Sequence, residues 1–502
     1  ASYSRLLVSP NIPKFHQPHL HICQFFAYIV GYLAYNAWFN PLRKYPGPLF
    51  MRATRLGYLH KAFKGTLPFD MLDLHKKYGP VVRIAPNELA FADPAAWNDI
   101  QGHRTKGQLE FEKAQLFYRP IDTMEIDIIS ADRTEHGLIR RTLSHGFSDK
   151  SLREQQPLIM GYIDKLIERL HENSNDGQNT VDIMAWYNFA TFDIIGDLAF
   201  GEPFGCLDSS DYHPWVRIIF KMARAGVVLQ ALGYYPSLKN FLLSLVPKSV
   251  EEQNKQHEEL TNEKLLRRME LGAERPDLIE GLLRKKDEWG LTMSRLSSNA
   301  GKLIIGGSET TATLLSGVTY FLAMNPAALE KVTNEVRSTF KTEEEIDFSS
   351  VNNLTYMLAC LNEALRMYPP VPVGLPRVAP KGGANVCGHY VPEGTVVGIH
   401  QWAMYHNDKF FKDPFNFHPE RFLGDKVFES DVREAFQPFH IGPRNCIGKN
   451  LAYVEMRTIL ARVLFNFDMR PTDSTPGWEK QRVFNLWEKP PLPVYLTPVK
   501  RS

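Results

Sequence analysis

Residues 438–448 read PFHIGPRNCIG and place one cysteine, Cys446, between two glycines just before a predicted helix over 451–467. Gly442 and Gly448 permit backbone conformations, and a close approach to a flat ligand, that a side chain would prevent. The start of the helix offers unpaired N–H groups and the positive end of the helix dipole, which favour a thiolate over a thiol. The segment therefore presents a reactive sulfur next to space for a flat molecule.

Arg444 adds a fixed positive charge two residues before the cysteine, suited to an anionic group on the same ligand. The segment from Phe439 to Gly448 matches the pattern Phe-x-x-Gly-x-Arg-x-Cys-x-Gly at every position. The alternative is a buried structural cysteine in a turn. The pattern resembles the haem-binding loop of the cytochrome P450 family. The resemblance implies that Cys446 is the axial thiolate of haem b, with Arg444, Phe439 and Gly448 beside the cofactor.

The resemblance covers the chain from about Tyr45 onward, with the family's motifs in their usual order. It implies a mainly α fold with a smaller β region, in which haem lies between the long central helix and the helix behind the cysteine. A chain of 502 residues, 44% of them hydrophobic, can form one large domain of this kind. The net charge of +2 argues against a nucleic-acid partner. Five scattered cysteines without a C-x-x-C pair indicate neither a zinc knuckle nor a disulfide framework.

The sequence predicts three parts. Residues 1–40 hold an apolar stretch, 20–39, that is long enough to cross a bilayer as a helix; the alternative is a buried or interfacial helix. Residues 41–48, PLRKYPGP, are expected to form a stiff linker, and residues 49–502 the catalytic domain. By resemblance to microsomal members, we expect a protein of the endoplasmic reticulum membrane with its catalytic domain on the cytosolic side.

The longest predicted helix, 291–324, carries the segment GGSETT at 306–311. Two glycines and two threonines are poor choices for the middle of a helix, so we expect a local breach with room for O2 and water. The alternative is a patch of small residues that lets another helix pack closely. The segment matches the family's Ala/Gly-Gly-x-Asp/Glu-Thr motif, which implies that Thr310 holds dioxygen and water and that Glu309 helps to relay protons.

Further basic residues are expected at the cofactor. His136 and Arg140 share one face of a predicted helix at i, i+4 spacing. Arg377 follows the segment VPVGLP at 371–376. By resemblance, these three residues and Arg444 bind the haem propionates, and 371–376 lines the substrate pocket. The alternatives are a solvated basic helix face and an exposed loop arginine.

Two other segments are assigned to the substrate pocket. Residues 102–130 lack clean periodicity and mix charges with aromatic side chains; a long irregular loop in a domain of this size is usually functional or mobile. In the family this position covers the pocket, although a merely solvated loop is the alternative. Residues 483–486 are expected to return to the pocket as a strand turn.

Glu363 and Arg366 lie three residues apart on one face of a predicted helix. Such pairs are common on solvated faces, so the spacing alone indicates little. Arg421 follows in a proline-fixed turn, and the family has a buried Glu–Arg–Arg cluster at these positions. Because a buried charge needs such pairing, we interpret the three residues as structural support for the cofactor loop rather than as catalysts.

The resemblance implies a haem-thiolate monooxygenase that uses O2 and electrons from NADPH to hydroxylate or epoxidise a largely apolar small molecule. The electrons would come from a separate NADPH-cytochrome P450 reductase, a flavoprotein, with cytochrome b5 as a second candidate donor. Lys449, Arg141 and Arg433 are candidate contacts for this partner on the cysteine side. The sequence resembles fungal secondary-metabolism members, which oxidise terpenoids, polyketides, alkaloids or cyclic dipeptides.

Other reactions remain open. One is oxidative coupling or ring closure, which keeps O2 and the reductase but inserts no oxygen. A second is a reductase-independent isomerase, dehydratase or peroxygenase; family members of that kind often lose the acid–alcohol pair that Glu309 and Thr310 form here. A third is a non-catalytic haem binder, which the intact Thr310 and the pocket-like loop disfavour.

Overall fold

The computed structural model describes residues 17–500, except 106, 122–123, 245–247, 273–274 and 276. The α-helices are α1 Gln17–Ala34, α2 Leu49–Ala53, α3 Leu56–Lys64, α4 Leu67–Tyr78, α5 Gln115–Tyr118, α6 Arg133–Leu143, α7 Asp149–Ser174, α8 Ile183–Phe200, α9 Cys206–Ser209, α10 Pro214–Gly233, α11 Pro236–Leu243, α12 Lys248–Glu270, α13 Glu280–Arg284, α14 Met293–Met324, α15 Pro326–Thr339, α16 Thr355–Met367, α17 Gln401–Tyr405 and α18 Lys449–Asn466. The strands are β1 Val81–Ala85, β2 Glu88–Phe91, β3 Glu112–Lys113, β4 Thr180–Asp182, β5 Arg377–Val378, β6 Ala384–Val386, β7 His389–Val391, β8 Val396–Gly398, β9 Phe467–Pro471, β10 Val483–Phe484, β11 Leu486–Trp487 and β12 Pro493–Pro498. The predicted mainly α fold with a smaller β region is confirmed.

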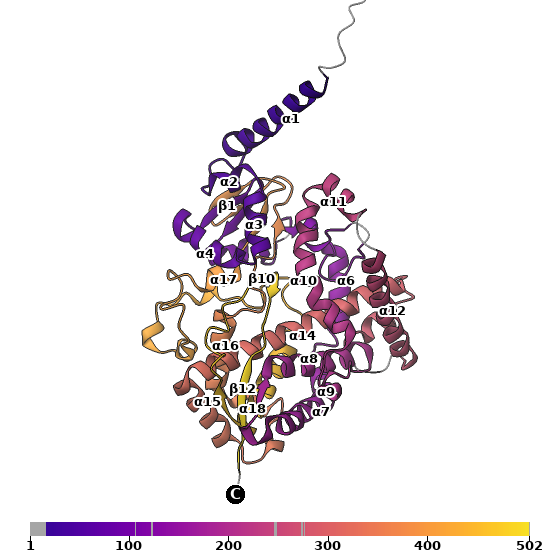
Figure 1. The fold of residues 1–502 in the computed structure, drawn as a ribbon, viewed down its shortest axis with the longest axis vertical. Helices are drawn as coiled ribbons and strands as arrows, with labels where there is room; N and C mark the ends of the chain where they lie inside the picture. Colours follow the sequence, from indigo (N-terminus) through magenta and orange to yellow (C-terminus); the bar gives the residue numbers. More distant parts are fainter. Residues whose placement is uncertain are drawn as a thin grey trace, which may run out of the picture.

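The helical core is built around α14, which crosses the middle of the molecule (Figure 1). The hydroxyl of Thr292 accepts a hydrogen bond from the Arg295 N–H and caps its first turn. Its second half is buried on nearly every side, against α8, α16 and α18. The partner α8 is likewise buried on nearly every side, as expected for a helix inside a core.

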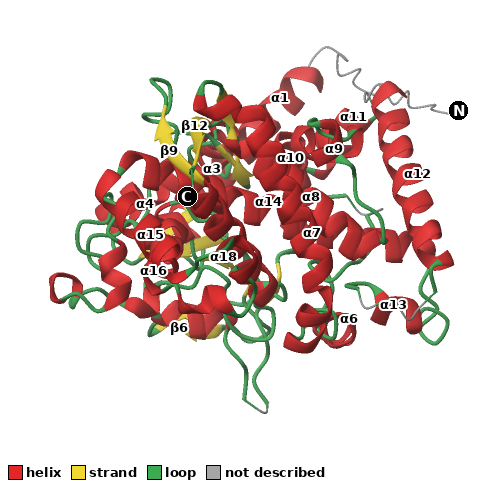
Figure 2. Cartoon of the chain, turned by 90° about the horizontal axis from the view of Figure 1, so that it is seen from below, coloured by secondary structure: helices red, strands yellow, loops and turns green. Residues whose placement is uncertain are grey.

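The strands form small sheets; β6, β9 and β12 lie on the side of α4, α15 and α16, whereas the side of α12 is helical (Figure 2). The largest sheet has the order β1-β2-β8-β5-β3. Its edge strand β3 pairs antiparallel with β5 and sets Lys113 opposite Arg377. This register brings two basic residues together that are far apart in the sequence.

The helix α1 projects from the body of the molecule (Figure 1). It is followed by a π-helical turn, Tyr35–Phe39, so the stretch predicted to cross a bilayer comprises two elements. In the part of the chain that the structure describes, no single helix is long and apolar enough to cross a membrane. Only α14 and α15 together have that length and composition, and they are bent by 114°. These findings do not support the predicted membrane-spanning helix; residues 1–16 of the predicted N-terminal part lie outside the described residues.

The proline-rich join at 41–48 packs against the body of the protein. Tyr45 is buried, and its hydroxyl donates a hydrogen bond of 2.5 Å to the Tyr390 carbonyl. The Arg83 N–H donates to the Pro46 carbonyl at 2.7 Å. A Cβ on Gly47 would lie 2.2 Å from the Arg83 carbonyl oxygen, so this position requires glycine. The join is therefore fixed to strand β1.

Candidate active site

The cysteine loop is closed by its own backbone and by a close contact with a distant turn. The Cys446 N–H donates to the Phe439 carbonyl at 2.9 Å. Gly442 has φ +77°, and a Cβ there would lie 1.9 Å from the carbonyl oxygen of Gln101. Any side chain at 442 would therefore displace the loop. Gly448 differs: its φ is −87°, and a Cβ would only touch the Phe147 ring at 3.6 Å, so neighbouring protein atoms do not require glycine there.

Cys446 lies three residues before Lys449, the first residue of α18. Part of the residue is open to solvent, yet surrounding protein atoms desolvate the sulfur and raise the pKa of the thiol above its ordinary value. The backbone N–H of Gly448 lowers that pKa, as the helix start predicted, and the cations Arg140 and Lys449 lower it further, but desolvation outweighs all three. Coordination to a metal would supply the missing driving force, because a coordinating thiol is deprotonated.

The predicted cofactor residues on α6 hold the cysteine loop from one side. Arg140 donates two hydrogen bonds to Asn445, one to its backbone carbonyl at 2.5 Å and one to its side-chain oxygen at 2.6 Å. His136, one turn earlier, is buried, and desolvation together with nearby Arg444 and Arg140 lowers its pKa to about 3. His136 is therefore neutral at physiological pH, and Arg140 positions the segment that carries Cys446.

Arg377 and Arg444, both predicted to bind propionates, converge on a buried polar cluster. Arg444 Nε donates to Glu110 Oε1 at 2.5 Å, and Arg377 Nη1 lies 3.9 Å from the same oxygen. Lys113, brought in by β3, lies with its ammonium 4.2 Å from the centre of the Tyr118 ring. Sequence reasoning missed Glu110 and Lys113, because both lie in the irregular loop, where no spacing indicates a partner.

Several buried polar atoms in this cluster have no hydrogen-bond partner among the described residues. They are Arg377 Nε, Tyr118 Oη and His440 Nε2. Burying such atoms without a partner is costly, so the cluster suits a ligand that brings acceptor oxygens. The two carboxylates of haem have this chemistry. The residues present therefore fit haem: Cys446 would bind its iron, and the arginine cluster its propionates.

The two glycines in the middle of α14 have different surroundings. A Cβ on Gly306 would meet no atom within 4 Å, whereas one on Gly307 would lie 2.6 Å from Ile195 Cδ1 on α8. Gly307 thus allows close packing of α14 against α8, which is the alternative to a functional role for these glycines. Gly306 leaves one face of α14 open. Thr310 lies on that face one turn later, and its hydroxyl donates to the Gly306 carbonyl at 2.6 Å. The expected breach is wrong, because α14 is continuous from Met293 to Met324.

Glu309 does not share the open face of Thr310, because adjacent residues in a helix point about 100° apart. Its carboxylate is buried, and Oε1 accepts a short hydrogen bond from the Lys489 ammonium. The same ammonium donates to the Thr313 hydroxyl at 2.6 Å. Oε2 is buried without a hydrogen-bond partner in the described part of the chain. Lys489 was missed from sequence because it follows β11 near the C-terminus, far from the α14 motif.

Replacing Lys489 by methionine is expected to lower the free energy of unfolding by about 3 kcal/mol, because a buried carboxylate loses its counter-ion. Urea unfolding measures this change, with Lys480→Met as the control at an exposed position. The double variant Glu309→Gln/Lys489→Met removes both charges and should recover most of the loss. A double variant as unstable as Lys489→Met alone would show that the ion pair is not the cause.

The predicted support cluster is fully buried. Arg366 donates from Nε and Nη2 to the two oxygens of Glu363, each at 2.8 Å, and Arg421 Nε also binds this carboxylate, at 3.0 Å. Arg366 Nη1 donates to the carbonyls of Tyr405 and Pro414. A fourth member, Asp431, accepts a short hydrogen bond from Arg421. The described cluster thus pairs two carboxylates with two guanidinium groups.

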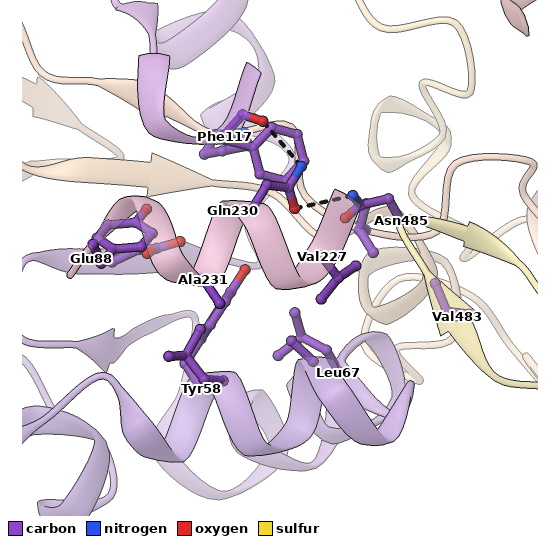
Figure 3. A pocket seen from close by; sticks show the side chains of 14 residues that line it. Tyr58, Leu67, Glu88, Phe117, Val227, Gln230, Ala231, Val483 and Asn485 are labelled. Atoms are coloured by element: carbon purple, nitrogen blue, oxygen red, sulfur yellow. Dashed lines mark hydrogen bonds between the residues drawn. The ribbon is translucent and has the colours of Figure 1, made fainter. Parts of the chain in front are cut away.

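A pocket with about 540 Å³ of empty space, its mouth included, lies between α3, α10 and the β10–β11 turn (Figure 3). The three segments assigned to the substrate pocket meet here and contribute Phe117, Val373, Pro376, Val483 and Asn485. The amide of Gln230 joins two of them: it donates to the Phe117 carbonyl at 3.0 Å and accepts from the Asn485 side chain at 3.1 Å. Thr310 and Cys446 are not among the residues that line this pocket.

Comparison with known proteins extends the likeness over the whole chain. A family model described as cytochrome P450 matches residues 44–496. The chain is 45% identical to cytochrome P450 monooxygenase prhB of Penicillium brasilianum, over 94% of this chain and 96% of that protein. It is 48% identical to cytochrome P450 monooxygenase tpeC of Talaromyces stipitatus, over 99% and 98%. It is 45% identical to trichothecene C-15 hydroxylase of Fusarium sporotrichioides, over 94% and 96%.

Proposed function

The chain belongs to the cytochrome P450 family, and we propose that its substrate is a largely apolar small molecule of fungal secondary metabolism, which it hydroxylates or epoxidises. One relative is a trichothecene hydroxylase, which supports a substrate of this class. The pocket supports it too, because apolar side chains such as Leu59, Leu67, Val227 and Val373 make up much of its lining. The amides of Gln230 and Asn485 add a few polar contacts.

The protein is a haem-thiolate monooxygenase, and Cys446 is the residue that binds the haem iron. Haem bound to this sulfur supplies the activation of O2. The protein orients the sulfur through the bonds from Arg140 to Asn445 and through the contact at Gly442. The observation that carries the function is this fixed cysteine loop at the start of α18, in a chain that matches the family from residue 44 to 496.

We assign dioxygen and water to the open face of α14, where Gly306 leaves the backbone uncovered and Thr310 carries a hydroxyl. Thr310 can pass a proton only if its hydroxyl leaves the Gly306 carbonyl, which now accepts it at 2.6 Å. The ion pair with Lys489 holds the Glu309 carboxylate away from the open face of α14. Proton transfer from Glu309 to Thr310 would therefore require the carboxylate to rotate or a water molecule to connect the two side chains. These roles of Thr310 and Glu309 remain proposals.

Replacing Thr310 by alanine should leave haem binding intact and divert electrons from product to hydrogen peroxide, so that product formed per NADPH falls several-fold. The reason is the loss of the hydroxyl that orders water on the open face. Peroxide, product and NADPH are measured together. The control is Ser308→Ala, which removes a hydroxyl that binds the Ile304 carbonyl on the buried side of the same helix. Fully coupled turnover in Thr310→Ala would refute the assignment.

The electron donor is proposed to be a separate NADPH-cytochrome P450 reductase, with cytochrome b5 as a second donor. Lys449, Arg141 and Arg433 are exposed and supply positive charge on the cysteine side for an acidic partner. Charge reversal at these positions should weaken reduction by the reductase, most strongly at low salt. Equal reduction rates at all salt concentrations would argue for another docking face.

We further propose that the protein works at the cytosolic surface of the endoplasmic reticulum membrane. Exposed apolar side chains on α1, including Phe25, Phe26 and Tyr28, support this location. Further exposed apolar residues lie on α2 and α11, at the end of the molecule from which α1 projects (Figure 1). Fractionation of the expressing cell tests the proposal, and recovery solely in the soluble fraction would contradict it.

The first experiment on the function is the absorption spectrum of the dithionite-reduced protein with carbon monoxide. A strongly red-shifted Soret band is expected and reports thiolate ligation of haem. Addition of NADPH and a reductase should then consume O2, and candidate substrates can be screened by the spin-state shift of the ferric protein. A band typical of histidine ligation would remove Cys446 from the iron, and the absence of haem would overturn the enzyme assignment.

A further inference from the structure

The cluster around Arg377 and Arg444 contains an acidic residue in a site that is expected to bind an acidic ligand. Glu110 makes the 2.5 Å contact with Arg444 Nε, and the same carboxylate oxygen lies 3.9 Å from Arg377 Nη1. The side chains of Arg377 and Arg444 are 5% and 4% exposed, and that of Glu110 is 12% exposed. Glu110 therefore uses part of the positive charge that a haem propionate would need.

Lys113 is the third cation of this cluster. Its register opposite Arg377 and its position over the Tyr118 ring place it among the same groups. Desolvation lowers the pKa of Lys113 well below its ordinary value, and Arg377 and Arg444 lower it further. Burial is the largest cause of this lower pKa, the two guanidinium groups add to it, and the carboxylates of Asp127 and Glu110 only partly offset it.

The other charged groups around the cluster are neutral, paired or solvated. His136 is neutral, with a pKa of about 3. Asp127 lies 3.6 Å from the Lys302 ammonium and accepts hydrogen bonds from two backbone N–H groups, so it has its own partners. Arg104 donates a hydrogen bond to the Asp99 carbonyl and interacts electrostatically with the carboxylates of Asp99 and Glu110. Arg133 Nε lies 3.8 Å from Glu110 Oε2, but the Arg133 side chain is 64% exposed, so water screens this charge.

Among the described residues, the cations that face Glu110 from inside the protein are thus Lys113, Arg377 and Arg444, while Arg133 approaches it from the solvent side. With Lys113 protonated, the three cations carry +3 and Glu110 carries −1, which leaves a charge of +2; desolvation opposes the protonated form of Lys113, and two nearby propionate carboxylates would favour it. The support cluster of Glu363, Arg366, Arg421 and Asp431 is by contrast neutral. The excess at the first cluster equals the charge of the two propionates of one haem.

We infer that Glu110 is a built-in counter-charge of the haem site, which with the two propionates balances the three cations Lys113, Arg377 and Arg444. The inference rests on the assignment of haem to this fold. The orphaned donors Arg377 Nε, Tyr118 Oη and His440 Nε2 then have two carboxylates to bind. Glu110 sets the charge beside the haem, and the charge in turn sets how firmly haem is held and how easily it is reduced.

The consequence for redox chemistry follows from Coulomb's law. Reduction of the haem adds one negative charge, so a more positive surrounding raises the reduction potential and a more negative one lowers it. A more positive surrounding likewise holds the dianionic haem more firmly, and a more negative one holds it less firmly. Removing Glu110 therefore acts in the opposite direction to removing Lys113, and removing both restores the balance.

The test uses the haem-loaded protein and four variants: Glu110→Gln, Lys113→Met, the double variant, and Glu112→Gln. The last neutralises an exposed acid in the same loop and serves as the matched control. Two quantities are measured: the reduction potential, and the rate at which haem passes to excess apomyoglobin. Glu110→Gln should slow haem loss by about tenfold and raise the potential, because one unit of negative charge disappears from a poorly screened site.

Lys113→Met should speed haem loss and lower the potential, and the double variant should lie close to the unmodified protein in both quantities. Glu112→Gln should leave both nearly unchanged. If Glu110→Gln behaves like Glu112→Gln, or if the double variant is as impaired as Lys113→Met, the counter-charge assignment is wrong.

Folding defects and failure of the haem assignment give different results. Lys113→Arg keeps the charge and should retain the potential of the unmodified protein; a potential as low as in Lys113→Met would mean that packing rather than charge is responsible. If the unmodified protein shows no thiolate band with carbon monoxide, the proposed function itself fails. A normal band with potentials that do not respond to either charge would overturn only the counter-charge.

Discussion

Cys446→Ser is expected to abolish the red-shifted band of the reduced, carbon monoxide-bound protein and to reduce substrate oxidation to background. A serine hydroxyl is a far weaker donor than a thiolate, so it cannot supply the electron density that favours O–O cleavage. The change replaces the sulfur by a smaller oxygen atom and therefore adds no bulk. The backbone bonds that close the loop, from Cys446 N to Phe439 O and from Asn445 N to Gly442 O, do not involve the side chain.

The loss should therefore be one of chemistry rather than of folding. Far-UV circular dichroism and urea unfolding should change little, while the absorption spectrum and turnover change completely. Cys23→Ser provides the matched control, because Cys23 is also a free cysteine but lies exposed on α1, away from the loop. An unchanged carbon monoxide band in Cys446→Ser would remove this residue from the iron.

Arg366→Met is expected to have the largest effect on stability, a loss of about 5 kcal/mol. The guanidinium is fully buried and binds both oxygens of Glu363 and the carbonyls of Tyr405 and Pro414. Methionine fills much of the volume but leaves the carboxylate with Arg421 as its remaining cation in the described cluster. A loss of this size is comparable with the total stability of many domains, so the yield of haem-loaded protein should collapse.

Arg169→Met is the matched control, since Arg169 also pairs with a glutamate three residues away but its side chain is 29% exposed. An exposed pair contributes about 0.5 kcal/mol, and its loss should leave yield and unfolding almost unchanged. Urea unfolding and the amplitude of the carbon monoxide band per milligram measure both variants. Equal stability of Arg366→Met and Arg169→Met would show that the buried cluster is not what supports the cysteine loop.

The parts of the site that the sequence predicted are those encoded by local spacing. The cysteine loop, the face of α14 with Gly306 and Thr310, and the Glu363–Arg366 pair are each set within one or two helical turns. Family membership, the mainly α fold and the monooxygenase class follow from these motifs and are confirmed. The propionate roles of His136, Arg140, Arg377 and Arg444, and the contacts of Phe439 and Gly448 with haem, stay predictions.

What the sequence did not reveal depends on contacts between distant segments. Lys489 pairs with Glu309, and Glu110 with Arg444, through the way β3, α14 and the C-terminal strands come together. Nothing in the spacing of a single lysine or glutamate indicates such a partner. The pKa of Cys446 was missed for a similar reason, because desolvation depends on how many atoms surround the sulfur and not on its position before a helix.

The contacts of the cysteine loop also bear on the order in which the chain acquires its structure. Arg140 donates hydrogen bonds to Asn445, 305 residues later in the sequence. Gln101, whose carbonyl lies close to Gly442, is separated from it by an even longer stretch of sequence. Such long-range contacts are gained only after the entropy of closing the intervening loop has been lost. The residues that hold Cys446 in place therefore come together late, when most of the helical core already exists. We therefore expect the site in which Cys446 would bind haem iron to form only when the chain is nearly folded.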